Sequence, residues 1–329
     1  VLIFEELMDS KALWLTANTT SVYNACWLEM SDEPMVLETP PDVLGIIDDH
    51  WFKYVGDFGR LGKDKGKGGK FLILPPGYEG KVPEGYTDVM KSNTYGNWIL
   101  WRGFQVDGST KAAVEATKKH FKVYPLSKKD NPPKMNFINA SGKEHNTTHR
   151  MDFEVYEEIN RVVQAEPSIG QSPEILGTFA AIGIKKGQPF KPDARLKKTL
   201  TDAANIGAVS VRAIIAKPRN KDFYLYPGKS TVWTNPFEAT KGSHEFLVDG
   251  AMQLDARAGF HFYATGITPA MTFKIIGKGS KYAIAYTDAD GDFLDGAKTY
   301  KLHVPPNPPA KDFWSFTLYD NQTRSMLQT

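Results

Sequence analysis

The hydrophobic pattern changes its period twice along the chain, and this change limits the architecture more than any other feature. Residues 1–135 hold apolar runs of about four residues, such as 35–38, 71–74 and 98–101, each bounded by Pro, Gly or Asn. Short runs between such turn residues are typical of strands in an all-β domain. A three- and four-residue spacing predicts one helix among them, over 111–121.

Residues 150–217 carry a helical period instead. Apolar residues recur at three- and four-residue spacing over 153–163, where Asp152 stands at the N-cap position. A second helix is predicted over 173–184, with proline at its first position, and a longer third one over 192–217. This part of the chain is therefore predicted to be a helical segment.

Strand-like runs return in the last third of the chain. They are spaced by roughly ten residues with Gly and Pro between them, which indicates a sandwich or jelly roll. These runs are 223–226, 260–263, 271–276, 282–286, 300–304 and 313–319. The predicted fold class is α+β, mainly β, with a β domain over 1–149, a helical segment over 150–217 and a β domain over 218–329.

Composition excludes several classes of protein. The chain has 329 residues, of which 41% are hydrophobic and 24% charged, as expected for a globular protein with a sizeable core. No run approaches the roughly 18 apolar residues that span a bilayer. The net charge of +2 argues against a nucleic-acid partner, and a single cysteine excludes an intrachain disulfide.

Standard catalytic motifs are absent, so the sequence alone does not show whether the protein is an enzyme. It contains neither G-x-S-x-G nor G-x-x-x-x-G-K-[ST]. Four polar residues have no evident structural role and are the candidate catalytic set: His149, Asp152, Asp255 and Arg257. His149 or Asp255 would act as the base and Arg257 would hold an anionic group, while a structural ion pair explains Asp255 and Arg257 equally well.

One short loop is rich in aspartates. Asp288, Asp290, Asp292 and Asp295 present oxygen atoms of the kind that calcium prefers. The spacing differs from an EF-hand, because glycine stands at loop position 4 and Thr299 stands where the bidentate Glu is expected. Asp-Gly pairs between strands are also ordinary hairpin chemistry, so a calcium site and a plain turn both remain open.

Longer motifs, ordered along nearly the whole chain, resemble a two-module family. The first part resembles domain of unknown function 1254, and the last part resembles domain of unknown function 1214. The first resemblance lies in residues 13–23, 33–38, 66–73, 75–78 and 97–102. The second lies in residues 254–257, 266–271, 288–296 and 313–327.

The resemblance implies two jelly-roll-like β-sandwich domains joined by a helical segment, in bacterial proteins that form homo-oligomers. Two functions follow as hypotheses. One is a hydrolase-like enzyme acting on a small organic or glycan-type substrate. The other is a non-catalytic binding or assembly protein whose jelly rolls mediate self-association. Compared with the family, the chain is expected to be incomplete at both ends, and an export signal upstream of Val1 would place it in the periplasm or outside the cell.

Overall fold

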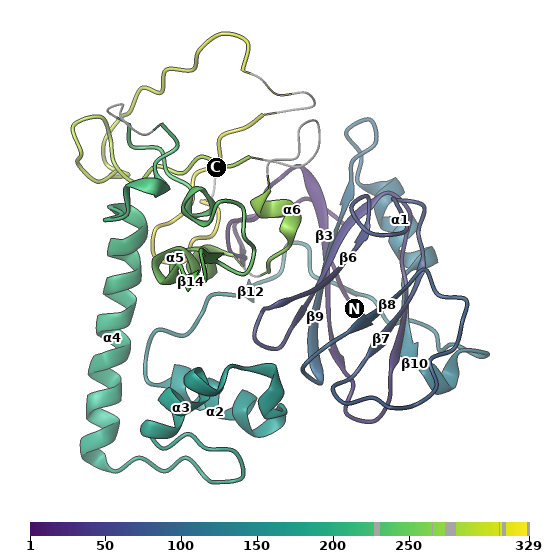
Figure 1. Ribbon diagram of the computed structural model, residues 1–329. Helices are drawn as coiled ribbons and strands as arrows, with labels where there is room; N and C mark the ends of the chain where they lie inside the picture. Colours follow the sequence, from purple (N-terminus) through teal and green to yellow (C-terminus); the bar gives the residue numbers. More distant parts are fainter. Residues whose placement is uncertain (227–230, 265, 274–280, 309, 311–313, 328–329) are drawn as a thin grey trace. The chain divides into compact units, whose positions relative to one another are not determined.

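A computed structural model describes residues 1–226, 231–264, 266–273, 281–308, 310 and 314–327. The fold is α+β (Figure 1). The chain divides into two compact units. Unit 1 contains residues 1–205, 265–268 and 319–329, and unit 2 contains residues 206–264 and 269–318.

Unit 1 is built on two β-sheets. The large sheet has the strand order β11-β1-β3-β9-β5-β6, and the small sheet has the order β10-β4-β7-β8. The strands of the large sheet are β1 (Leu2–Ile3), β3 (Ser21–Glu29), β5 (Val43–Asp49), β6 (Tyr54–Gly59), β9 (Gly96–Phe104) and β11 (Ile138–Asn139). Those of the small sheet are β4 (Met35–Glu38), β7 (Lys70–Leu74), β8 (Asp88–Lys91) and β10 (Lys122–Pro125). A further pair joins β2 (Ala12–Leu13) to β12 (His145–Asn146).

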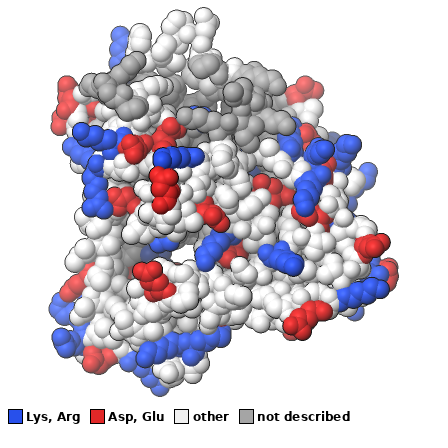
Figure 2. Space-filling view, viewed as in Figure 1, with Lys and Arg blue, Asp and Glu red and all other residues white. Residues whose placement is uncertain are grey.

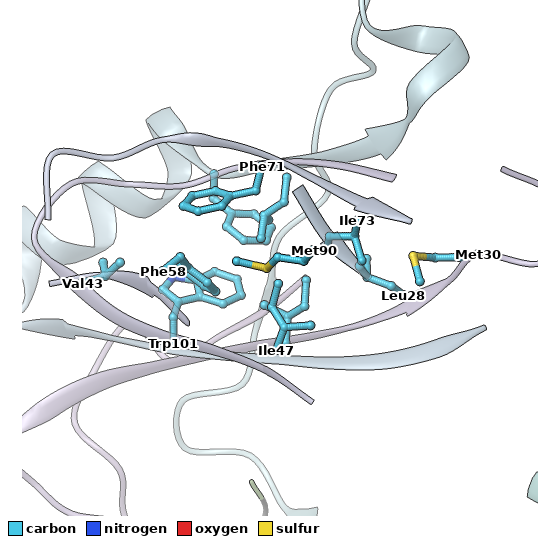
Figure 3. Close-up of a cluster of buried hydrophobic side chains, with 12 residues drawn as sticks. Leu28, Met30, Val43, Ile47, Phe58, Phe71, Ile73, Met90 and Trp101 are labelled. Atoms are coloured by element: carbon cyan, nitrogen blue, oxygen red, sulfur yellow. The ribbon is translucent and has the colours of Figure 1, made fainter. Parts of the chain in front are cut away.

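The main core of unit 1 lies between these two sheets (Figure 3). Ile47 and Trp101 of the large sheet and Phe71 and Ile73 of the small sheet belong to one cluster and are fully buried. Burying a side chain of this size stabilises a fold by about 1.5–3 kcal/mol. Because alternate residues of a strand face opposite sides, the residues between these core positions form the outer face of the large sheet.

Glycine is required where β6 ends. Gly59 has φ +81°, and a Cβ atom there would lie 2.0 Å from the carbonyl oxygen of Val43 on the neighbouring strand. A side chain would therefore force β5 and β6 apart.

The helices of unit 1 lie where the three- and four-residue spacing of apolar residues predicts them. They are α1 (Lys111–His120), α2 (Glu154–Ala165), α3 (Pro173–Ala181) and the first part of α4 (Ala194–Ala216), with the short 3₁₀ turns η1 (Leu126–Lys128) and η2 (Ser168–Gly170). Ser172 caps α3 by accepting a hydrogen bond from the Ile175 N–H, and Pro173 follows at the first helical position. Among the residues that the structure describes, none of the helices has the length and apolar composition needed to cross a membrane.

Unit 2 consists of short elements. They are the rest of α4, η3 (Lys221–Phe223), η4 (Pro236–Thr240), β13 (Leu247–Val248), β14 (Ala251–Met252), α5 (Leu254–Tyr263) and α6 (Pro269–Thr272). Two isolated bridges connect Thr234 with Tyr224 and with Ile284. The strand predicted over 260–263 is wrong, because these residues form the last turn of α5 and bury Phe260 and Phe262. The strands predicted over 271–276 and 223–226 are also wrong at their starts, because Met271 and Thr272 belong to α6 and Phe223 ends η3. The described residues of the runs 282–286, 300–304 and 313–319 belong to none of the named strands. Residues 274–276 and 313 lie outside the described residues.

Charged side chains of both signs are interspersed on the face shown in Figure 2. This distribution fits a net charge of +2 on 329 residues. A one-sign field able to steer a polyanion is not visible on that face.

Candidate functional site

The outer face of the large sheet places unusual side chains in one row across four strands. The pairing register aligns Trp27 of β3 with Trp98 of β9, Trp98 with Asp48 of β5, and Asp48 with Tyr54 of β6. Asp48 is fully buried, whereas Trp27 is 43% exposed. The exposed ring of Trp27 and the buried carboxyl group of Asp48 therefore lie in the same row of side chains.

Two carboxyl groups at the β5–β6 end, the buried one of Asp48 and the half-buried one of Asp57, bind a segment from much later in the chain. Oδ2 of Asp48 accepts a hydrogen bond from the Ile267 N–H at 2.7 Å. The Thr268 hydroxyl donates to Asp57, at 2.7 and 3.0 Å from its two oxygens. Burial raises the pKa of Asp48 well above its usual range, the Ile267 N–H opposes this, and the charges of Asp49 and Asp57 add to it. Burial and the neighbouring carboxylates therefore disfavour the charged form of Asp48 more than water does.

The turn between β5 and β6 is fixed by Asp49. Its Oδ1 accepts hydrogen bonds from the Trp51 N–H at 2.8 Å and the Lys53 N–H at 2.9 Å. Between these residues Phe52 adopts φ +54°, a left-handed conformation that costs a non-glycine residue about 1 kcal/mol. Burial raises the pKa of Asp49 to about 6, although both N–H groups favour its charged form. The turn presents His50 and Trp51 on a defined backbone.

His50 is bound by a buried glutamate at the end of α2. Its Nδ1 donates to Oε1 of Glu166 at 2.5 Å, and the Glu166 side chain is only 2% exposed. The same carboxylate accepts the N–H groups of Tyr95 at 2.6 Å and Gly96 at 2.9 Å. Burial alone would raise the pKa of Glu166, but the hydrogen bonds from His50, Gly96 and Tyr95 outweigh it and hold that pKa below its usual value.

The geometry orients the imidazole. Because an ionised carboxylate only accepts hydrogen bonds, the proton of neutral His50 lies on Nδ1, and Nε2 keeps its lone pair. The His50 side chain is 24% exposed, and its ring packs edge-on against Trp27 with ring centroids 4.7 Å apart. A carboxylate-oriented histidine beside an exposed aromatic ring can abstract a proton from a molecule placed on that ring.

The structure distributes the sequence-predicted catalytic residues between the two units. His149 and Asp152 lie on the exposed segment before α2 in unit 1, where Asp152 binds Arg150 at 2.6 Å and accepts the Glu154 N–H. Their catalytic role remains a prediction.

Asp255 and Arg257 lie on α5 in unit 2. Asp255 accepts two hydrogen bonds from the guanidinium group of Arg219, at 2.7 and 2.9 Å. Its partner is therefore Arg219, which the sequence reasoning did not select. The catalytic role of Asp255 and Arg257 also remains a prediction.

The aspartate loop of unit 2 shows turn hydrogen bonds. Oδ1 of Asp288 accepts the N–H groups of Asp290 and Asp292, and Oδ1 of Asp295 accepts the Ala297 N–H. Within the described part of the chain, no group of three or more His, Cys, Asp or Glu side chains is arranged to hold a metal ion. Calcium binding at Asp288, Asp290, Asp292 and Asp295 remains a prediction.

Sequence reasoning missed His50, Glu166 and Trp27. A local signal was present in the run Asp48-Asp49-His50-Trp51, where two acids, a histidine and a tryptophan follow a strand. Nothing local connects that run to Glu166, which lies 116 residues further along the chain.

Comparison with known proteins identifies the two parts of the chain. The family model described as a protein of unknown function, DUF1254, matches residues 2–125, and that of DUF1214 matches residues 279–329. The chain therefore belongs to the two-module family that combines DUF1254 with DUF1214, as its motifs predicted. His50 and Trp27 lie within the first module.

A solved structure has a similar fold. The VPA0106 protein from Vibrio parahaemolyticus matches with a TM-score of 0.55 at 18% sequence identity, over 95% of this chain and 72% of that chain. At this identity the likeness concerns the fold alone. No curated protein matches the sequence.

Proposed function

We propose that the protein is a hydrolase-like enzyme acting on a small organic or glycan-type substrate, with its site on the outer face of the large sheet. The observation that carries this proposal is the 2.5 Å contact between His50 Nδ1 and Oε1 of the buried Glu166. A carboxylate that orients the imidazole in this way is the arrangement by which many hydrolases prepare a general base.

The chemistry uses His50 as the base and water as the nucleophile. Among the described residues, no hydroxyl or thiol group is hydrogen-bonded to the His50 ring. Nε2 would take a proton from a water molecule while the water oxygen forms a bond to the electrophilic carbon of the substrate. The bond to the leaving group then breaks, and the imidazolium returns its proton to that group.

Trp27 would position the substrate. Its exposed indole ring offers a flat apolar surface beside the imidazole, and such surfaces stack against planar groups and the apolar faces of sugars. Ionised Glu166 would stabilise the imidazolium that forms during the reaction, since it accepts the Nδ1 hydrogen bond throughout.

The test is a panel of chromogenic esters, phosphates and glycosides assayed with matched histidine variants. We expect turnover by the wild type and a loss of at least about 100-fold in kcat/KM for His50→Gln, in line with removal of a general base. His120→Gln, at the exposed end of α1, is the control and should behave as the wild type. A panel without turnover, or a loss confined to His149→Gln, would contradict the proposal.

Our second proposal is a non-catalytic function in which the chain self-associates. In this proposal the β domains have a jelly-roll form and mediate the association. It is supported by apolar side chains on α4 that are open to solvent, Ile206 at 66% and Val209 at 67% exposure. Light scattering coupled to size-exclusion chromatography should give a mass above that of one chain, and the double substitution Ile206→Lys and Val209→Lys should lower it. A monomeric wild type would refute self-association.

Export to the periplasm or the medium is proposed as well. Fractionation of the cells that produce the protein tests it, and recovery from the cytoplasm alone would refute it.

A further inference from the structure

Gly96, the first residue of β9, lies against the contact between His50 and Glu166 and has no room for a side chain. A Cβ atom at this position would lie 2.7 Å from Nδ1 of His50, 3.2 Å from its Cγ and 3.0 Å from Oε1 of Glu166. Real Cβ atoms do not approach other heavy atoms closer than 3.0 Å. Any residue larger than glycine would therefore displace the imidazole ring or the carboxylate.

The backbone conformation at residue 96 does not itself require glycine. Gly59 needs it because φ is +81° there, whereas Gly96 is not among the residues with positive φ. Glycine in a strand is otherwise unfavourable, since it loses much conformational freedom on folding and has no side chain to pack. What glycine provides at position 96 is therefore space for the His50–Glu166 contact.

The main chain of Gly96 is also bound to both residues of this pair. Its N–H donates to Oε1 of Glu166 at 2.9 Å, and the same oxygen accepts the hydrogen bond from His50 Nδ1. Its carbonyl oxygen accepts the hydroxyl group of Thr94 at 2.7 Å, and Oγ1 of Thr94 accepts the His50 N–H at 3.0 Å. Thr94 is fully buried. Gly96 is thus connected to the His50 side chain through Glu166 and to the His50 backbone through Thr94.

We propose that Gly96 is a positioning residue for the general base, and that Thr94 assists it. The inference rests on the hydrolase proposal, and it names the residues that hold the base of that reaction in place. Gly96 acts through His50: the missing side chain lets the ring reach Glu166, and the Thr94 hydroxyl group fixes the backbone from which the ring projects.

An added methyl group should release the ring while the strand persists. The His50 side chain is 24% exposed, so it can turn toward solvent, whereas the Glu166 side chain is buried. Away from Glu166, the neutral imidazole can carry its proton on either nitrogen, and Nε2 is then no longer held ready as the acceptor. Because a misplacement of about 1 Å can lower a rate about 100-fold, turnover should fall even though the protein folds.

The first experiment compares Gly96→Ala with Gly103→Ala, which adds a methyl group near the other end of β9. The control is also crowded, since its Cβ would lie 2.8 Å from Cβ of Ala113, but it is remote from His50. Long-range ¹H–¹⁵N NMR of the His50 ring should show the proton on Nδ1 in the wild type and in Gly103→Ala. In Gly96→Ala the proton should be distributed over both nitrogens. On a substrate of the panel, Gly96→Ala should lower kcat about tenfold or more and leave KM within about twofold, because Trp27 is unchanged.

The two readouts separate this inference from the hydrolase proposal. If the wild type turns over no substrate of the panel, the hydrolase proposal fails, and the NMR comparison still decides whether Gly96 positions His50. If the panel gives turnover, a Gly96→Ala protein with the wild-type His50 spectrum and the wild-type kcat overturns the positioning role alone. An equal change of the His50 spectrum in Gly103→Ala would also overturn it, because the effect would then be a general one of crowding β9.

Thr94 provides a second pair of variants if Gly96→Ala does not fold. Thr94→Val keeps the shape of the side chain but removes the hydroxyl group that binds the His50 N–H and the Gly96 carbonyl oxygen. It should lower kcat about tenfold and weaken the Nδ1 proton signal of His50. Thr94→Ser retains the hydroxyl group and should restore both to the wild-type values within about twofold. Identical His50 spectra and kcat values for Thr94→Val and Thr94→Ser would overturn the proposal.

Discussion

The buried end of α2 gives the strongest prediction about stability. Substituting Glu166→Gln keeps the shape of the side chain but replaces one carboxylate oxygen by an NH₂ group. Both oxygens accept N–H donors, so one donor of the protein then meets another donor in a side chain that is 2% exposed. A lost hydrogen bond to a buried charged group costs about 1.5–3 kcal/mol, and we therefore expect the free energy of unfolding to fall by about 2 kcal/mol.

Urea unfolding followed by tryptophan fluorescence measures this change, and amide hydrogen exchange locates it. Exchange of the Tyr95 and Gly96 N–H groups should accelerate in Glu166→Gln, because the carboxylate accepts both. Glu158→Gln is the matched control on α2, where a 47% exposed side chain lies 3.7 Å from Arg161 and contributes less than about 0.5 kcal/mol. A Glu166→Gln protein as stable as the Glu158→Gln control would refute the role given to this carboxylate.

Three further predictions concern other parts of the chain. The folded-state pKa of Asp49 is about 6 against an ordinary 3.8, so this residue should lower the free energy of unfolding by about 3 kcal/mol as pH rises from about 4 to above 6. Asp49→Asn should remove that part of the pH dependence in urea titrations, and an unchanged pH profile would contradict the assignment. Thr268→Val deletes the hydroxyl that binds Asp57, and should cost about 1–2 kcal/mol and accelerate exchange of the Ile267 N–H; unchanged exchange would show that the segment is held in another way. If the loop 288–295 binds calcium, EGTA should lower the Tm of the calcium-loaded protein, and an unchanged Tm would remove calcium from the account.

Local elements of unit 1 could be predicted because their signals are local. The apolar run at 35–38 coincides with β4 (Met35–Glu38), and the spacing over 111–121 coincides with α1 (Lys111–His120). Short-range periodicity and turn residues determine both.

The strand predicted over 260–263 failed for a physical reason. Four consecutive apolar or aromatic residues carry no period of their own, so a helix and a strand fit them equally. The deciding information lies upstream, where α5 begins at Leu254 and buries Ala256, Gly259 and Phe260 on one side.

The candidate site could not be predicted, because it depends on contacts between distant segments. His50 meets Glu166 over a separation of 116 residues, and Asp48 meets Ile267 over 219. The row from Trp27 to Tyr54 follows from the strand register, which short apolar runs do not specify.

The most direct test of the central claim is a long-range ¹H–¹⁵N NMR spectrum of the His50 ring in ¹⁵N-labelled protein, recorded where the imidazole is neutral. The account predicts that the proton lies on Nδ1, bound to Glu166, and that Nε2 is unprotonated and available as a base. A proton on Nε2 would show that Glu166 does not orient the ring for catalysis and would contradict the proposed site.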